Sequence, residues 1–310
     1  MEIILYSAAL LLGFVLLVKG ADYFVEGAAS VAKKLGIPEI VIGLTIVAMG
    51  TSSPEMAVSI TAALTGSADI TIGNVVGSNI LNILLILGIT AVMTAVSISQ
   101  STIRYEIPFM IGCSVLILLQ GLDQTIDFKD GIVLWLFFGM YLTYLFVSTK
   151  AAEQEPGKPS VTKGWIQVLY VIGGLSAIVL GSKCAVYGAT RLAQMCGISE
   201  RLIGLTIVAF GTSLPELFTS VTAAKKGNAD IAIGNIVGSN IFNILFIIGT
   251  TACIKPVTFD AGFHVDSYIM IVAGIMLLLC SVRKKKLTRL GGIIMLLSYS
   301  GYFGYLCYMD

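Results

Sequence analysis

Long apolar runs, separated by short polar stretches, recur along the whole chain. Most are about 20 residues long, which is the length that an α-helix needs to cross the hydrocarbon core of a bilayer. We therefore expect an all-α polytopic membrane protein. The pattern predicts ten transmembrane helices, near residues 3–31, 38–66, 70–96, 104–121, 129–149, 164–195, 201–226, 230–253, 265–282 and 287–308.

A polar segment that contains Pro156 and Pro159 divides these spans into two groups of five. The predicted organisation is a first five-helix repeat at 1–149, a linker at 150–163 and a second five-helix repeat at 164–310. Each half has an odd number of spans, so the second half must enter the membrane from the opposite side. The ten helices should therefore form two inverted-topology repeats, an arrangement that many secondary transporters share.

The halves carry an internal repeat. Residues 42–82 and 203–243 align without a gap, 161 residues apart, and 29 of the 41 positions are identical. Each copy places one carboxylate, Glu55 or Glu216, inside a long apolar segment. A charged side chain at the bilayer centre costs at least roughly 2.5–3.5 kcal/mol, so it needs a purpose and a partner. Two such carboxylates, placed by a duplication, predict one shared site for a cation.

A proline in each copy predicts a helix break. The motif Gly-Thr-Ser-x-Pro-Glu stands at residues 50–55 and at 211–216. Proline lacks the N–H that continues a helix and clashes with the carbonyl four residues earlier. Helices 2 and 7 should therefore be discontinuous, with a serine as the N-cap of the restarted helix. The carbonyls of residues 48–51, and those near Ala209 and Thr212, should lose their amide partners and become free ligands.

The next helix of each copy adds polar side chains at steps of four residues, which keeps them on one helical face. The predicted oxygen donors are carboxylates, amides, hydroxyls and backbone carbonyls, with no His or Cys among them. Such a set suits hard cations such as Ca²⁺ and Na⁺ and argues against Zn²⁺ or Cu⁺. Ions that compete for one charge-neutralising site would give antiport. The two sets of side chains are Asn74, Ser78 and Asn82, and Asn235, Ser239 and Asn243.

Composition and charge narrow the function further. Of 310 residues, 56% are hydrophobic and only 12% are charged, whereas about a quarter are charged in soluble domains. A net charge of +1 indicates no nucleic-acid partner. Thirteen Lys and Arg residues lie in the linker and other loops on its side, against four on the opposite side. By the positive-inside rule, both termini should lie outside and the linker in the cytoplasm.

The two motifs together resemble the alpha-repeats of the cation/calcium exchanger superfamily, most closely those of the prokaryotic sodium/calcium exchangers. The resemblance implies electrogenic exchange of Na⁺ for Ca²⁺ by alternating access in the cell membrane, with no cofactor, no protein partner and a functional monomer. The long first and sixth spans look like the sliding pair that switches access. The implied ligands are the carboxylates of Glu55 and Glu216, the backbone carbonyls of Ala48, Thr51, Ala209 and Thr212, and the side chains of Ser52, Ser78, Asn82, Ser213, Ser239 and Asn243.

Other functions remain open. A proton-coupled Ca²⁺ antiporter of the same fold is the runner-up. Proton-coupled relatives usually carry an acid and His after the Gly-Asn pair, where this chain has Val75-Val76-Gly77, so proton coupling is less favoured. Asn243 stands where potassium-dependent relatives have Asp, which argues against potassium use. A cation channel needs no inverted pair of broken helices. An enzyme is disfavoured because an intramembrane protease dyad would use aspartates.

Several side chains also have simpler structural interpretations. Glu55 and Glu216 could be the acids of a capping box, and Asn82 and Asn243 could join helices by hydrogen bonds. Packing or backbone hydrogen bonding is the preferred role for four further asparagines. In the first span, Asp22 lies near enough to Lys19 to pair with it. The loop acids at 123–130 favour a solvated turn over a cation site. The four asparagines are Asn74, Asn79, Asn235 and Asn240.

Overall fold

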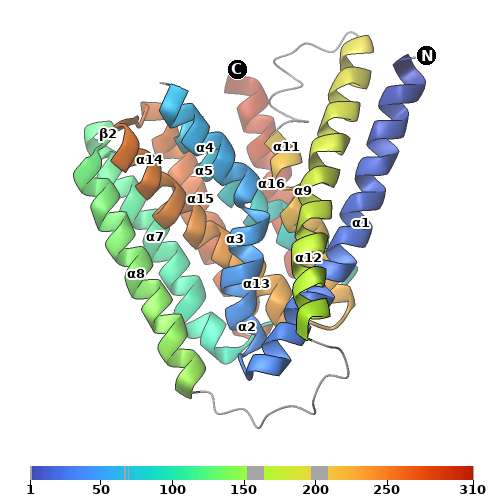
Figure 1. Ribbon diagram of the computed structural model, residues 1–310. Coiled ribbons are helices and arrows are strands. Elements are labelled where there is room, and N and C mark those ends of the chain that lie inside the picture. Colours follow the sequence, from blue (N-terminus) through green and yellow to red (C-terminus); the bar gives the residue numbers. More distant parts are fainter. Residues whose placement is uncertain (1, 66–67, 69, 152–163, 197–208, 310) are drawn as a thin grey trace.

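The computed structural model describes residues 2–65, 68, 70–151, 164–196 and 209–309. The chain forms a bundle of long helices with both termini at one end (Figure 1). The described ends of α8 (Phe128–Ala151) and α9 (Gly164–Met195), which flank the predicted linker, lie at the other end. Eight helices among the described residues are long and apolar enough to cross a membrane, or nine if a bent pair counts as one span. The prediction of an all-helical membrane protein is confirmed.

The first half contains these elements in order. It begins with α1 (Glu2–Leu35), followed by the bent run α2 (Glu39–Ile42), η1 (Gly43–Val47), α3 (Ala48–Thr51) and α4 (Ser53–Thr65). The next run is α5 (Ile70–Leu81), η2 (Asn82–Ile86) and α6 (Leu87–Met93). Then come β1 (Val96–Ser97), η3 (Thr102–Glu106), α7 (Ile107–Gln120), η4 (Gly121–Asp123), β2 (Thr125–Ile126) and α8. These bounds differ from the predicted spans by a few residues.

The second half repeats this order. After α9 come α11 (Ala209–Thr212), α12 (Leu214–Lys225), α13 (Ala229–Phe242), η6 (Asn243–Ile248) and α14 (Gly249–Ile254). They are followed by β3 (Val257–Thr258), α15 (Ala261–Val282), β4 (Lys286–Leu287) and α16 (Arg289–Met309). Most of the predicted linker, and the first part of the span expected at 201–226, lie outside the described residues.

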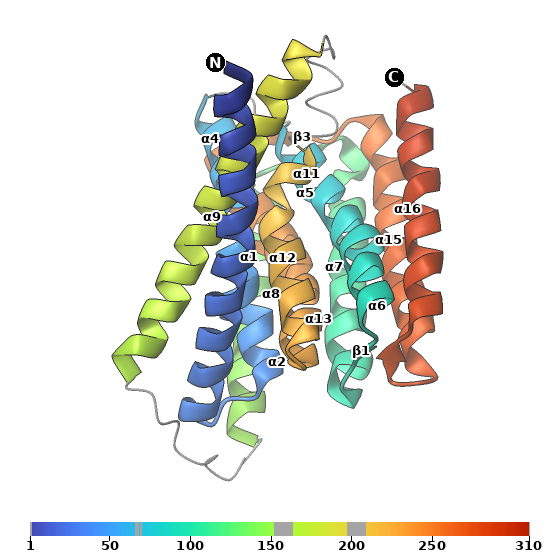
Figure 2. The same ribbon diagram turned by 90° about the vertical axis from the view of Figure 1, so that its right-hand side faces the viewer.

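Two short antiparallel ladders join the halves. Strand β1 pairs with β4, placing Val96 opposite Leu287, and β2 pairs with β3, placing Ile126 opposite Val257. At the repeat offset of 161 residues, Val96 corresponds to Val257 and Ile126 corresponds to Leu287. The two ladders are therefore equivalent under the repeat. They lie at opposite ends of the bundle (Figure 2). The hydrophobic pattern did not predict them, because a strand of two residues is too short to show an alternation.

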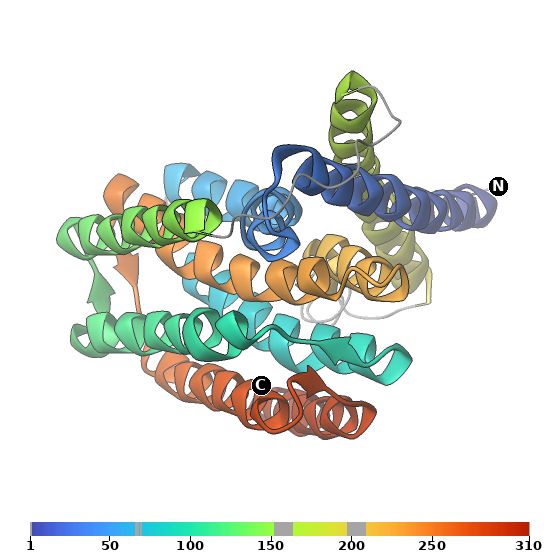
Figure 3. The same cartoon turned by 90° about the horizontal axis from the view of Figure 1, so that it is seen from below.

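Helices α1 and α9 pack against each other along their length, to one side of the bundle (Figure 3). Both carry a glycine at every seventh position along the contact. A Cβ added at Gly13 would lie 2.5 Å from the backbone nitrogen of Ala185, and one at Gly174 would lie 2.5 Å from that of Phe24. Only glycine permits so close an approach of two helix backbones. The glycines are Gly13, Gly20 and Gly27 in α1, and Gly174, Gly181 and Gly188 in α9.

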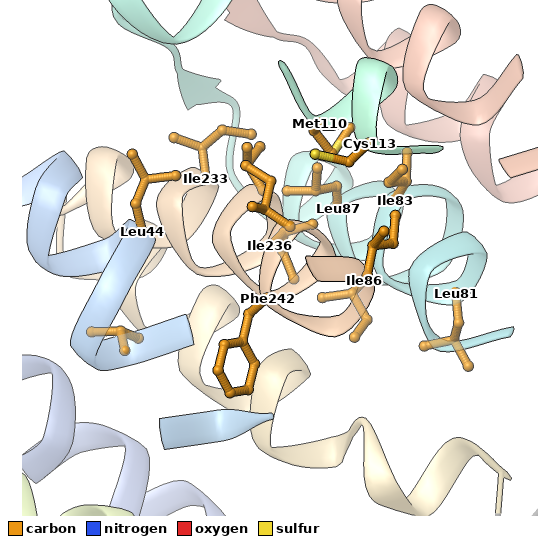
Figure 4. Packing of buried hydrophobic residues seen from close by; sticks show 14 of the residues in the cluster. Leu44, Leu81, Ile83, Ile86, Leu87, Met110, Cys113, Ile233, Ile236 and Phe242 are labelled. Carbon is orange, nitrogen blue, oxygen red and sulfur yellow. The ribbon is translucent and has the colours of Figure 1, made fainter. Parts of the chain in front are cut away.

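The two repeat motifs supply the centre of the bundle. In the span from Ala229 to Ile254, 94% of an 18-residue apolar stretch is buried. The corresponding stretches of α1 and α16 are each only 17% buried. Apolar side chains of α13 interlock with those of η1, η2, α6 and α7 (Figure 4). Polar side chains on these central helices therefore face protein. The residues labelled in Figure 4 include Leu44, Ile83, Leu87, Met110, Ile233, Ile236 and Phe242.

Candidate cation site

The second span bends at Ser52. Helix α3 ends at Thr51, α4 begins at Ser53, and the two runs meet at an angle of 50°. Ser52 itself has φ −79° and ψ 8°, outside the helical region. Pro54 follows in the first turn of α4, which agrees with the predicted discontinuity of helix 2. The corresponding serine, Ser213, separates α11 from α12 in the second half.

The expectation that the carbonyls before the break lose their amide partners is wrong for Ala48. Its oxygen accepts the N–H of Ser52 at 3.0 Å, and it also accepts the hydroxyl of Ser239 at 3.3 Å. The proline removes the hydrogen bond that Gly50 would have accepted four residues later. The hydroxyl of Ser53 compensates by donating to the Gly50 oxygen at 2.7 Å. The chain therefore bends without losing every backbone hydrogen bond.

The expected N-cap interaction is also absent where the structure describes it. Ser213 stands at the N-cap of α12 but makes no side-chain capping bond. Its hydroxyl donates instead to Oε1 of Glu55 in the other half, at 3.4 Å. Ser52 makes the reciprocal bond, donating to Oε1 of Glu216 at 2.9 Å. The two serines thus connect the halves, which excludes a capping box at α12.

The two glutamates are buried, and each accepts a hydrogen bond from a serine of the opposite motif. Each is about 1% exposed, and they lie near enough for their charges to interact. Thr212 lies beside Glu55, and Thr51 and Ser239 lie beside Glu216. The hydroxyl of Thr51 donates to Oδ1 of Asn235 at 2.9 Å, and that of Ser239 donates to the Ala48 backbone oxygen at 3.3 Å. Each carboxylate therefore lies among hydroxyl groups that the opposite half supplies.

Four asparagines form a reciprocal set of hydrogen bonds beside the glutamates. The amide of Asn79 donates to the backbone oxygen of Asn240 at 3.1 Å, and the amide of Asn240 donates to that of Asn79 at 3.2 Å. Asn82 donates to Oδ1 of Asn240 at 3.0 Å, and Asn243 donates to Oδ1 of Asn79 at 3.1 Å. Each half donates to the other half the same hydrogen bonds that it accepts from it. Such a self-complementary contact is typical of two parts related by a two-fold axis.

Asn82 and Asn243 also open the π-helical segments η2 and η6. A π-helical turn inserts one residue into an α-helix and is frequent at functional sites. The sequence pattern did not indicate these turns, because one inserted residue hardly changes the spacing of apolar positions. The hydrogen bonds show that both asparagines join helices. They do so through their amide nitrogens, which leaves their oxygens for another role.

Among the described residues, twelve buried side-chain oxygens have no hydrogen-bond partner, and four of them belong to acid or amide side chains of the two repeat motifs. All four belong to residues no more than about 1% exposed. A buried acceptor without a partner costs about 1–3 kcal/mol or more, so such atoms usually mark an absent ligand or a functional role. The four form two pairs under the 161-residue repeat. They are Oε2 of Glu55, Oε2 of Glu216, Oδ1 of Asn82 and Oδ1 of Asn243.

The chemistry of these donors fits a hard cation. Within the described part of the chain, no group of three or more His, Cys, Asp or Glu residues is arranged to hold a metal ion. A cation at this position would therefore be held by two carboxylates and neutral oxygens. Ca²⁺ accepts such mixed oxygen ligands, and soft metals prefer sulfur or imidazole.

The remaining predicted ligands lie on helices of the two motifs. Ser78 is buried on α5, and the backbone of Ala209 opens α11. Asn74 and Asn235 are not aimed at the unpartnered oxygens. Their amides donate to the backbone oxygens of Glu55 and Glu216, at 3.2 and 3.3 Å. Their predicted backbone-satisfying role is confirmed.

One route to this centre is open. A cleft of about 770 Å³ lies between α4 and α9. It extends from Ser53 and Thr212 to Thr65 at the end of α4, on the side of the molecule where the termini lie (Figure 1). Thr212 lies beside Glu55, so the cleft reaches a side chain next to the carboxylate.

The equivalent route on the other side is closed between α1 and α12. The rings of Phe14 and Phe218 lie 6.2 Å apart. Beyond them, Nζ of Lys226 lies 3.3 Å from Oδ1 of Asp22 and donates to its backbone oxygen at 2.7 Å. The expected partner of Asp22, Lys19, was therefore wrong. Sequence spacing could not find Lys226, because it belongs to the other half.

The acidic loop between α7 and α8 is a helix cap. Asp127 accepts the backbone N–H groups of Lys129 at 2.7 Å and Asp130 at 3.1 Å, and Asp130 accepts that of Asp127 at 3.0 Å. The N–H groups of Asp130 and Lys129 lower the pKa of Asp127 below its usual value. These acids therefore start α8, which supports the solvated turn.

A pair of buried carboxylates among neutral oxygens, at the centre of a bundle of apolar helices, defines a membrane protein with an intramembrane cation site. A family model described as sodium/calcium exchanger protein matches residues 5–147 and again residues 166–308. The chain belongs to this family of transporters. The two matches fall on the two predicted halves.

Individual relatives agree. The chain is 42% identical over 304 residues to the putative antiporter CaxA of Alkalimonas amylolytica, covering 94% of this chain and 95% of that protein. It is 32% identical to the sodium/calcium exchanger MaX1 of Methanosarcina acetivorans, covering 97% and 98%. Among solved structures, it is similar to the sodium-calcium exchanger NCX_Mj, with a TM-score of 0.87, 30% identity, and 98% and 99% of the two chains covered.

Proposed function

We propose that this protein is a secondary active antiporter that exchanges Na⁺ for Ca²⁺ across the membrane by alternating access. The observation that carries the proposal is that buried carboxylate and amide oxygens at equivalent positions of the two motifs, in Glu55, Glu216, Asn82 and Asn243, have no hydrogen-bond partner. Two ionised glutamates match the charge of one Ca²⁺, and several Na⁺ can neutralise the same charge. Because both ions need the same oxygens, the site cannot hold both loads at once.

The proposed ligands extend beyond these four atoms. The backbone oxygens of Ala48 and Thr51, with those of Ala209 and Thr212, lie on the short helices that lead to each bend. Side-chain hydroxyls from both motifs complete the set: those of Ser52, Ser78, Ser213 and Ser239. Ser52 and Ser213 already touch the opposite glutamates, so a bound cation would meet oxygens from both halves at these positions.

Two inverted five-helix repeats with ten spans are the architecture that best supports such a site. The equivalent ladders at opposite ends of the bundle and the reciprocal asparagine bonds both favour it. In this arrangement, the termini face outside and the linker faces the cytoplasm. The open α4–α9 cleft is then an outward route, and the α1–α12 contact closes the inward one.

Purified protein in sealed vesicles tests the proposal directly. Vesicles loaded with Na⁺ and diluted into Na⁺-free medium with Ca²⁺ should accumulate Ca²⁺, and collapse of the Na⁺ gradient should stop uptake. Ca²⁺ uptake driven by a pH gradient instead would make this a proton-coupled antiporter. Ca²⁺ movement that needs no counter-ion would indicate a channel. Either result would overturn Na⁺/Ca²⁺ exchange.

A further inference from the structure

One basic side chain lies along the open route to the cation site. Lys183 lines the α4–α9 cleft with Val179 and Val186, which share its face of α9 at helical spacing. It is exposed to the cleft. The preceding residue, Ser182, donates its hydroxyl to the backbone oxygen of Gly211 at 2.6 Å. Lys183 follows Ser182 in α9, and Thr212 follows Gly211 in α11. This bond therefore holds Lys183 near Thr212.

The opposite half handles its equivalent position differently. The repeat places Asp22 where Lys183 stands, and Lys226 where Thr65 stands. On the closed side, Asp22 and Lys226 form an ion pair. On the open side, Lys183 shares the cleft with Thr65, and the described lining of the cleft contains no Asp or Glu. One approach to the site therefore carries a neutralised pair and the other a single positive charge.

A fixed charge acts on a divalent ion twice as strongly as on a monovalent ion at the same place, because Coulomb energy is proportional to the ion's charge. A basic residue in a cation route has no favourable contact to offer either ion. It raises the free energy of both, and that of Ca²⁺ more. Positive side chains in pores form barriers of this kind.

We propose that Lys183 is a specificity-determining residue that weakens Ca²⁺ relative to Na⁺ at the site reached through the α4–α9 cleft. This inference depends on the proposed exchange function. It gives a quantitative rule. If removal of the charge strengthens apparent Na⁺ binding by a given factor, apparent Ca²⁺ binding should strengthen by about the square of that factor.

The test compares Lys183→Gln with two controls. Lys183→Arg keeps the charge, and Lys129→Gln removes an exposed lysine outside the cleft. Binding of each ion alone is measured on detergent-purified protein, as the concentration dependence of thermal stabilisation at constant ionic strength. For Lys183→Gln we expect about a threefold gain for Na⁺ and about a tenfold gain for Ca²⁺. Both controls should match the wild type, and the gain should shrink at high salt.

Three results separate the possibilities. Equal changes for both ions, or none, with a folded Lys183→Gln variant would overturn the role of Lys183. A variant that does not fold shifts the comparison to Lys183→Met, to which the same rule applies. Failure of the wild type to exchange Na⁺ for Ca²⁺ in vesicles would instead contradict the proposed function. Because binding is measured separately from exchange, the two failures can be told apart.

Discussion

At the scale of single residues, side chains of each half complete the site by hydrogen-bonding the other half. Ser52 reaches Glu216 and Ser213 reaches Glu55, while Asn79 and Asn240 bond each other's backbone. Neither motif is complete alone, because each carboxylate takes hydroxyl donors from the other copy. Four acceptor atoms of these motifs, in Glu55, Asn82, Glu216 and Asn243, remain without a partner, as the proposed cation site requires.

Glu55→Gln and Glu216→Gln should each abolish Ca²⁺ transport. The change keeps the shape of the side chain and leaves one negative charge against a divalent ion. Ca²⁺ uptake into Na⁺-loaded vesicles is the measurement. Glu106→Gln is a control for the loss of a buried carboxylate, since Glu106 is also buried but lies in η3, outside the two motifs, and accepts the hydroxyl of Tyr144. Normal transport by either site variant would refute a shared site.

Adjacent serines offer a sharper comparison. Ser52→Ala removes the donor to Glu216 and should weaken Ca²⁺ binding about tenfold or more, because hydrogen bonds to charged groups are worth about 1.5–3 kcal/mol. Ser53→Ala removes only the bond to the Gly50 backbone and should change Ca²⁺ binding little. Titration of both variants with Ca²⁺ measures the difference. Equal loss in the two would show that the bend, and not the contact across the halves, controls affinity.

Much of the site could be predicted from residue identity and spacing. Glu55 and Glu216 are conspicuous as acids in apolar segments, and the repeat places them in equivalent positions. The direction of the hydroxyls of Ser52 and Ser213 could not be predicted, because a serine before a helix normally caps it. Tertiary contact decided otherwise. The retained amide bond of Ala48 was missed for a related reason, since a proline removes one specific bond and the rest adapt.

At the scale of elements, the α1–α9 pair differs from the rest of the bundle. The two helices meet through glycine backbones at every seventh position, and ring contacts of Tyr6 with Tyr187 and of Tyr23 with Tyr170 add side-chain packing between them. The central helices, by contrast, are almost wholly buried. The helices were readily predicted from their apolar length, whereas their partners followed only from the three-dimensional contacts.

Neighbouring glycines in α9 test the importance of this contact. Gly174→Val would place its side chain within 2.5 Å of the Phe24 backbone, whereas Gly173 has open space around it. Gly174→Val should lower the free energy of unfolding by about 1–3 kcal/mol and impair transport. Gly173→Val should do neither. Thermal unfolding in detergent and vesicle uptake check this, and equal behaviour of the two variants would contradict close packing as the requirement.

At the scale of the whole molecule, one side of the bundle is open to the site and the other is closed. The closed side carries the Asp22–Lys226 ion pair, whose partners are 41% and 32% exposed. Pairs with this exposure contribute about 1 kcal/mol or less. Such a contribution can bias two access states severalfold without locking either, which suits a transporter that must visit both.

Reversal of the pair tests this bias. Asp22→Lys should shift the population away from the described state by up to about fivefold, and combination with Lys226→Asp should restore it. A cysteine placed at Ala57, in the open cleft, reports the population through its rate of labelling by a water-soluble reagent. Labelling that is unchanged by the single substitution would remove the ion pair from any role in closure.

The ladders β1–β4 and β2–β3 have a consequence for the separated halves. Every strand in them finds its partner in the opposite half. A single half, made by itself, would expose two unpaired strand edges and two asparagine amides without their acceptors. In the inverted arrangement that we propose for the halves, a second copy inserted in the opposite orientation would satisfy those groups. Two identical chains in that antiparallel arrangement would reproduce both ladders and bring a pair of glutamates together, so the present molecule is physically equivalent to a fused dimer.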